Sequence, residues 1–132
     1  DEKGRAELDQ AMAMVGFSEQ HIADMFATIG GVLFLGNVEF CKPANGTASD
    51  PTMVSPVSQS DLDQAAQLLG VNSKELAEAL TSHKIQSGGR GSVALQVLTV
   101  EGSGANKDTL AKETYKRLFD WVVTQVNTVV EA

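Results

Sequence analysis

The sequence has 132 residues, of which 42% are hydrophobic and 20% are charged, a balance that suits one globular domain with an apolar core. Ten lysines and arginines against 17 aspartates and glutamates give a net charge of -7, which argues against a nucleic-acid partner. The single cysteine, Cys41, cannot form an internal disulfide, and no apolar run approaches the roughly 18 residues of a membrane helix. Together these features indicate a cytoplasmic chain without membrane insertion.

Two helices are predicted in the first part of the chain, at residues 3–15 and 19–35, because apolar residues recur there three and four positions apart. Gly16 is expected to end the first helix in the left-handed conformation, and Ser18 to cap the second. The expected buried face of the second helix consists of Ile22, Met25, Phe26, Ile29, Val32 and Leu33. The Gly30-Gly31 pair in its middle costs about 1 kcal/mol per glycine relative to alanine, which indicates close approach of another backbone.

An exposed loop is predicted at residues 41–59, which hold all three prolines together with Asn, Gly, Ser and Thr. Asn45-Gly46-Thr47 fits a glycosylation acceptor, although a simple turn is the better interpretation in a cytoplasmic chain. Two short helices should follow, at residues 61–69 and 73–81.

The expected boundaries of these short helices come from their capping residues. Ser60 with Asp63 should cap the first helix, and Gly70 should end it. Asn72 with Glu75 should cap the second. The inward-facing residues are expected to be Leu62, Ala65, Ala66, Leu69, Leu76, Ala79 and Leu80.

From about residue 84 to residue 100 the apolar period changes to two, around a Ser-Gly-Gly-Arg-Gly stretch. This pattern predicts a β-hairpin, with Val93, Leu95 and Val97 on one face. The following glycine-rich residues, 102–107, lack the G-K-[ST] ending of a phosphate-binding loop, so no nucleotide site is expected there.

A long helix is predicted at residues 108–130, and its apolar residues form a face broad enough to require packing against a core. That face consists of Leu110, Ala111, Tyr115, Leu118, Phe119, Val122, Val123, Val126, Val129 and Val130. Glu113 with Arg117 and Lys116 with Asp120 are opposite charges four residues apart, as expected on an exposed side. The fold class is therefore mainly α: a bundle-like helical subdomain with a small β-hairpin and two long surface loops.

Two stretches carry a family resemblance. The stretch D-T-L-A-K-E-T-Y-K-R-L-F-D-W-V-V-T-Q-V-N, from Asp108 to Asn127, resembles a helix of the myosin motor domain that reads roughly D-A-L-A-K-x-x-Y-x-R-L-F-x-W-L-V-x-x-I-N. The segments A-M-A-M-V-G-F-S and L-G-N-V-E-F, within residues 11–40, resemble a second signature of that family. Phe34 stands where the family usually has histidine, and Gly30-Gly31 replaces a more alanine-rich stretch, which suggests an unconventional or divergent class.

The resemblance implies that residues 1–132 are a single subdomain, part of the upper fifty-kilodalton subdomain between switch I and switch II of a myosin head. Neither end of the chain looks like a natural terminus, so an excised segment is expected. The parent would be a cytoskeletal motor that hydrolyses MgATP, binds actin filaments and carries light chains. The segment itself would have no catalytic residues, cofactor or metal, and would contact the remaining subdomains of the head.

The resemblance also places the loop at 41–59 and the hairpin against actin. The candidate actin-facing residues are Lys42, Lys84, Arg90, Ser92 and Val93. Family members usually carry Thr, Glu, Asp or Ser sixteen residues before the aspartate of D-A-L-A-K, and here that position is Ser92. Phosphorylation of Ser92, adding about -1.5 to -2 charges, would then favour contact with actin. The alternatives are that Ser92 only serves the turn and that the basic residues are only solvated.

The sequence allows two alternative interpretations of function. A free-standing helical module could bind a partner peptide on a face around Phe119 and Trp121, although both residues also suit a core. A small enzyme is disfavoured, because the sequence holds no recognisable nucleophile, base or metal constellation, and His21 and His83 stand alone.

Overall fold

The computed structural model describes residues 2–47, 50–87 and 92–131. Its elements in chain order are α1 (Glu2–Met14), α2 (Glu19–Gly36), β1 (Phe40–Cys41), β2 (Met53–Val54), the 3₁₀ turn η1 (Pro56–Ser58), α3 (Gln59–Leu69), α4 (Ser73–Thr81), β3 (Ser82–Ser87), β4 (Ser92–Val97) and α5 (Val100–Glu131). The strands form two separate antiparallel pairs, β1 with β2 and β3 with β4. The predicted mainly α fold is confirmed.

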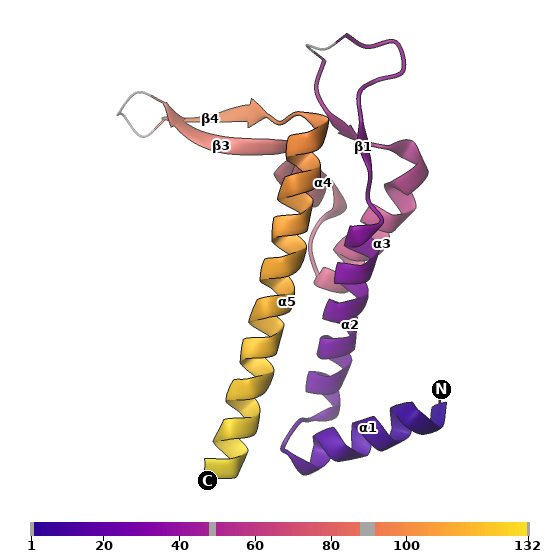
Figure 1. Ribbon diagram of the computed structural model, residues 1–132, viewed down its shortest axis with the longest axis vertical. Coiled ribbons are helices and arrows are strands. Elements are labelled where there is room, and N and C mark those ends of the chain that lie inside the picture. Colours follow the sequence, from indigo (N-terminus) through magenta and orange to yellow (C-terminus); the bar gives the residue numbers. More distant parts are fainter. Residues whose placement is uncertain (1, 48–49, 88–91, 132) are drawn as a thin grey trace.

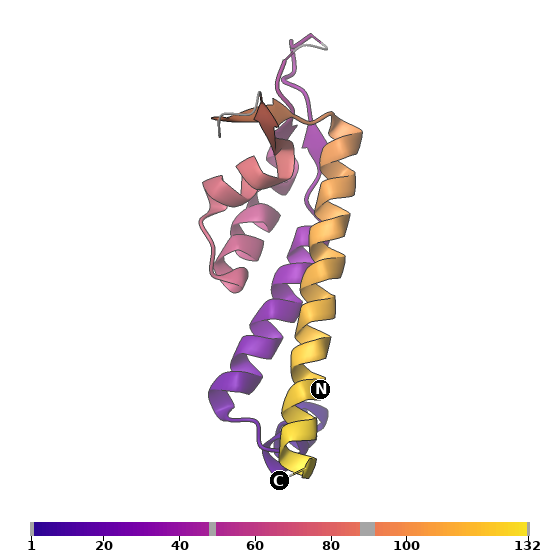
Figure 2. The same ribbon diagram turned by 90° about the vertical axis from the view of Figure 1, so that its left-hand side faces the viewer.

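Two long helices, α2 and α5, run side by side along the length of the molecule (Figures 1 and 2). The shorter α3 and α4 pack beside the half of this pair where α5 begins, and α1 crosses the opposite end. The β3–β4 hairpin and the loop between β1 and β2 both project from the end where α5 begins (Figure 1). Both segments that were expected to be functional thus lie at one end.

The larger core lies between α2, α3, α4 and the loop strands. Its buried residues are Leu35, Val38, Val54, Leu62, Ala65, Ala66, Leu76 and Leu80. Each buried leucine contributes about 1.5–3 kcal/mol relative to an exposed one. Phe34, at the position where the family has histidine, is partly buried against this core. Ala79, expected to face inward, is instead exposed, and so is Leu33 of α2.

A smaller core joins the opposite ends of α2 and α5. Phe17, Ile22 and Met25 are buried there, and the indole of Trp121 lies 5.6 Å from the Phe17 ring and 5.3 Å from the His21 ring. Phe119 is 60% exposed, because two residues along a helix correspond to a rotation of about 200°. Phe119 and Trp121 therefore do not form one face for a peptide.

The boundary between α1 and α2 follows the sequence prediction. Gly16 has φ +93°, and the Ser18 hydroxyl accepts a hydrogen bond from the backbone N–H of His21 at 3.0 Å. In return, His21 Nδ1 accepts the Ser18 N–H at 3.3 Å, which completes a capping box. His21 thus has a structural role, as a cap and as part of the smaller core.

The glycine pair of α2 lies against α3, although the closest contacts are not with another backbone, as predicted, but with side chains. A Cβ at Gly31 would lie 2.6 Å from Leu69 Cγ and 3.5 Å from the Ala65 carbonyl oxygen. A Cβ at Gly30 would lie 3.2 Å from Leu68 Cδ1. Most of this contact is made by side chains of α3 rather than by its backbone.

The predicted start of the last helix was wrong, because α5 begins eight residues earlier, at Val100 rather than at 108. Thr99 provides the cap: its hydroxyl accepts the Gly102 N–H at 2.9 Å, and its carbonyl accepts the Ser103 N–H at 2.8 Å. Packing holds this first turn in place, since Ser103 is fully buried. Tertiary contacts therefore outweigh the poor helix propensity of glycine.

The predicted broad apolar face of α5 is only partly covered. Leu110, Ala111, Leu118, Val122 and Val126 are partly buried against the two cores. The remaining members of the face are exposed: Tyr115 57%, Phe119 60%, Val123 40%, Val129 41% and Val130 74%. Glu113 pairs with Arg117 at 3.1 Å, whereas Lys116 and Asp120 form no ion pair within the residues that the structure describes.

The predicted cap of α3 was also wrong. The helix begins at Gln59, so Ser60 lies inside it, and the residue at the cap position, Ser58, makes no side-chain capping bond. Asp63 instead accepts hydrogen bonds from Ser73 Oγ at 2.5 Å and from Gln59 Nε2 at 3.0 Å. Chiefly the Ser73 bond, and then the Gln59 bond, lower the pKa of the Asp63 carboxyl below its ordinary value. Asp63 therefore joins α3 to the start of α4.

The later boundaries agree better with the predictions. Gly70 ends α3 with φ +74°, and the Asn72 side chain accepts the Glu75 N–H at 3.1 Å to cap α4. The hairpin strands begin two residues before the predicted start, at Ser82, and end at Val97. Residues 98–100 belong to the entry into α5 and not to the hairpin.

Candidate functional site

The β3–β4 hairpin has a definite register. Lys84 pairs with Leu95, Gln86 with Val93, and Ser87 with Ser92. Ser92 is thus the first residue of β4, Val93 is the second, and Lys84 is exposed on β3. Three of the five candidate residues lie on this one hairpin, and Arg90 lies outside the described residues.

The predicted loop at 41–59 is less open than expected, because its two ends are joined. Phe40 pairs with Val54 and Cys41 with Met53. The Ser55 N–H donates to the Glu39 carbonyl at 2.7 Å, and the Glu39 N–H donates to Ser58 Oγ at 2.9 Å. Three residues of the predicted loop are buried: Thr52, Val54 and Ser58. The ends of the loop are therefore part of the fold, and only its middle extends outward.

Lys42, the fifth candidate, follows directly on β1. It is partly buried, and its ammonium group donates to the Asp50 carbonyl across the loop. The Thr47 N–H donates to Asp50 Oδ2 at 2.5 Å in the same loop. Lys42 thus takes part in the internal structure of the loop, besides any contact that it makes with a partner.

The loop and the hairpin are joined to each other where the hairpin ends. Thr52, which is 5% exposed, donates its hydroxyl proton to the Leu98 carbonyl at 2.6 Å. The Leu98 N–H donates to the Thr81 carbonyl at 2.9 Å, just before β3 begins. Leu98 therefore holds the end of the loop and both ends of the hairpin.

Two polar side chains near the start of α5 complete this base. Asn106 Nδ2 donates to the carbonyls of Ala79 at 2.9 Å and Leu80 at 3.4 Å, in the last turn of α4. Lys107 Nζ donates to the carbonyls of Gly36 at 3.1 Å and Val38 at 3.0 Å, where α2 ends and leads into β1. Both side chains bond carbonyls at or just beyond the C-terminus of a helix. The positive charge of Lys107 is also favourable at this position, because it interacts with the helix dipole.

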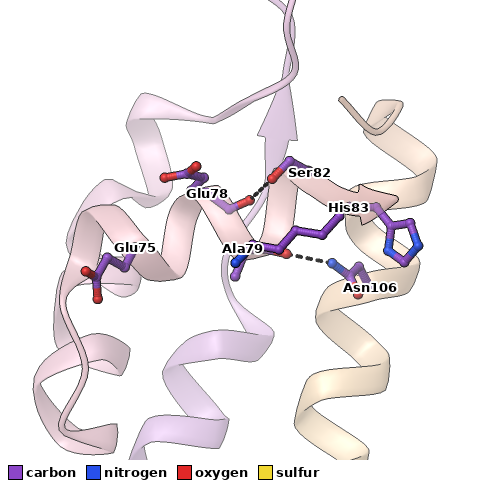
Figure 3. Close-up of a pocket in the computed structure, with 7 residues that line it drawn as sticks. Glu75, Glu78, Ala79, Ser82, His83 and Asn106 are labelled. Carbon is purple, nitrogen blue, oxygen red and sulfur yellow. Dashed lines mark hydrogen bonds between the residues drawn. The ribbon is translucent and has the colours of Figure 1, made fainter. Parts of the chain in front are cut away.

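An open pocket of about 650 Å³ lies beside this base, between α4, the start of β3 and α5. Figure 3 shows Asn106 directed at the Ala79 carbonyl and Ser82 at the Glu78 carbonyl, and the latter bond measures 2.6 Å. Glu75, Glu78, His83 and Lys84 also line the pocket. Its walls carry both signs of charge, so it does not select an anion or a cation.

The glycine-rich stretch of the described chain does not form a phosphate-binding loop. The glycine-rich stretch at 102–107 is helical, and its lysine, Lys107, is bound to backbone carbonyls. No group of three or more metal-ligating side chains is found within residues 2–47, 50–87 and 92–131.

Sequence reasoning missed the residues that hold the base: Thr52, Thr99, Asn106 and Lys107. Thr99 caps α5 locally, through Gly102 three residues on, so a capping pattern could have found it. No local pattern marks Thr52, Asn106 and Lys107, since their partners lie between 26 and 71 positions away in the chain.

Comparison with known proteins decides the family. The family model of the myosin head (motor domain) matches residues 1–132, the whole chain. The chain belongs to the myosin head family. The resemblance of its two signatures to myosin is therefore confirmed.

This myosin segment is similar to several curated relatives. It is 31% identical to myosin-IIIa of Homo sapiens over 124 residues, which cover 94% of this chain and 7% of that protein. It is 29% identical to unconventional myosin-Ig of Homo sapiens over 131 residues, covering 99% of this chain and 13% of that protein. It is 35% identical to unconventional myosin-VI of Homo sapiens over 120 residues, covering 89% and 9%. The chain thus spans a small part of the relatives that it matches.

The structure adds one observation on membranes. In the part of the chain that it covers, no helix has both the length and the apolar content needed to cross a bilayer.

Proposed function

We propose that this chain is the segment of the upper fifty-kilodalton subdomain between switch I and switch II in a cytoskeletal, actin-based myosin motor. In this proposal the hairpin and the loop between β1 and β2 face the actin filament. The observation that carries the proposal is the shared base, in which residues 98–107 hold the ends of both segments at one end of a long helical block. A binding surface mounted on rigid elements is positioned more precisely than one on free loops.

The chemistry belongs to the parent motor, which would bind and hydrolyse MgATP and carry light chains. This segment would contribute mechanically, with α2 and α5 carrying movement between the actin-facing end and the rest of the head. The exposed apolar side chains of α5 support the assignment as a part of a larger domain, because apolar patches of this kind usually mark an interface. They would pack against the remaining subdomains of the head.

The test compares motor domains that carry this segment with Ser92 unchanged, with Ser92→Ala and with Ser92→Glu. Actin co-sedimentation with and without ATP and actin-activated ATPase activity are measured. We expect ATP to release all three from actin, and the glutamate variant to show the highest actin-activated rate, because it mimics part of the phosphate charge. The unphosphorylated native protein should behave like the alanine variant.

Ser87→Glu is the matched control, since Ser87 pairs with Ser92 on the opposite strand and places the same charge at the same level of the hairpin. It should leave the rate close to that of the alanine variant. Equal effects of both glutamates would refute a specific role of Ser92. If the motor domains bind no actin filaments either with or without ATP, the motor assignment is refuted. That result would favour a helical protein-interaction module.

A further inference from the structure

We infer that the hairpin and the loop between β1 and β2 act as one coupled actin-facing unit, with the Thr52 hydroxyl as the positioning link between them. The inference rests on the proposed function, because it concerns the same two segments. A change in the hairpin would then alter how the loop contributes to actin binding, and the reverse.

The hydrogen bonds at the base give the physical reason. Val38, just before β1, has its carbonyl bonded by Lys107, and Thr52, just before β2, is bonded to Leu98. The hairpin starts after Thr81, whose carbonyl is held by the Leu98 N–H. Ten consecutive residues, 98–107, thus contact the chain before β1, before β2 and before β3, and continue directly from the end of β4.

Thr52 is the direct side-chain link in this arrangement. Its hydroxyl bonds a residue 46 positions away, and at 5% exposure water is a poor substitute partner. Loss of the hydroxyl would leave the Leu98 carbonyl without this donor and release the loop end from the hairpin end. Groups that share one hydrogen-bond network are those whose mutational effects fail to add.

The experiment is a double-mutant cycle on the actin affinity of a motor domain that carries this segment. Ser92→Glu changes the hairpin, Lys42→Met changes the loop, and the two are combined. Kd for actin is measured by co-sedimentation at fixed salt. With Thr52 present, we expect the affinity of the double variant to differ from the product of the single effects by about threefold or more.

The cycle is then repeated with Thr52→Val, which keeps the shape without the hydroxyl, and with Thr52→Ser, which keeps the hydroxyl. The coupling should fall to a factor of one with valine and return with serine. A merely structural role of Thr52 would weaken binding and leave the coupling factor unchanged.

Each outcome distinguishes the two claims. If the effects of Ser92→Glu and Lys42→Met simply add while Thr52 is native, the coupling is overturned. This result does not depend on whether a Thr52 variant folds. Coupling that persists with valine overturns the role of Thr52. If neither Ser92→Glu nor Lys42→Met alters actin affinity, the proposed actin-facing function fails first, and the coupling fails with it.

Discussion

Gly16 combines two requirements that a side chain cannot meet. Its φ of +93° lies in the left-handed region, and a Cβ there would lie 2.5 Å from Val129 Cγ2, near the end of α5. Gly70 also has a positive φ, +74°, but nothing lies within 4 Å of its Cβ position. An alanine at Gly70 would therefore suffer only backbone strain, whereas an alanine at Gly16 would suffer both strain and a steric clash.

We expect Gly16→Ala to destabilise the chain more than Gly70→Ala. The left-handed conformation costs alanine about 1–2 kcal/mol at either position. Overpacking adds about 1–3 kcal/mol at Gly16 alone. Urea unfolding followed by the fluorescence of Trp121, which lies in the smaller core, measures both. Equal losses would mean that the end of α5 moves away from Gly16 at no cost.

At the scale of elements, the contact between α2 and α3 depends on Gly31. Its Cβ position lies 2.6 Å from Leu69 Cγ and 2.7 Å from Leu69 Cδ2, so alanine would force the helices or the leucine to move. Gly36, at the end of the same helix, has nothing within 4 Å. Alanine gains about 1 kcal/mol over glycine in a helix interior such as position 31, and less at Gly36, the last residue of α2.

Gly31→Ala should therefore lower the free energy of unfolding, by about 1–2 kcal/mol after the gain in propensity is subtracted from the overpacking cost. Gly36→Ala should leave it unchanged or raise it by up to about 1 kcal/mol. Thermal unfolding followed by circular dichroism distinguishes the pair. A stabilising Gly31→Ala would show that the close approach of α3 carries no packing cost.

At the scale of the whole molecule, the chain is an elongated pair of long helices with two separate cores (Figures 1 and 2). The exposed side chains Tyr115, Phe119, Val123 and Val130 follow each other at steps of four, four and seven along α5. This spacing places them on one flank of the helix. We call these four residues the α5 stripe.

The purified 132-residue chain should self-associate through the α5 stripe, because no other part of the described chain covers it. Phe119→Lys should reduce the association seen by sedimentation velocity, without loss of helix content. Thr124→Lys, which adds the same charge at an exposed position of α5 outside the stripe, should have no such effect. Equal behaviour of the two variants would place the contact elsewhere.

Much of the helical framework could be predicted locally. Capping at Ser18 and Asn72 and the positive φ of Gly16 and Gly70 depend on neighbours within a few residues, and the structure confirms each. Asp63 is a residue whose partners the local pattern did not predict. The predicted pairing of Asp63 with a capping Ser60 was wrong, because Asp63 accepts from Gln59 and from Ser73, which lies ten residues away on the next helix.

The candidate site was predictable only as a set of segments. The hairpin and the loop follow from periodicity and composition, and their proposed actin-facing role rests on resemblance, but neither pattern relates the two segments to each other. Lys42 illustrates the limit, because its bond to the Asp50 carbonyl depends on how the loop closes.

The sequence by itself determined which stretches are helical and which family they belong to, because helix periodicity, caps and signatures are local patterns. The tertiary structure alone decided that α5 begins at Val100, that half of its apolar face stays exposed, and that Thr52, Asn106 and Lys107 join the two projecting segments at one base. The physical reason is that burial and hydrogen bonds between distant residues exist only once the helices have packed. Contacts between distant residues produce no periodic pattern in a single sequence.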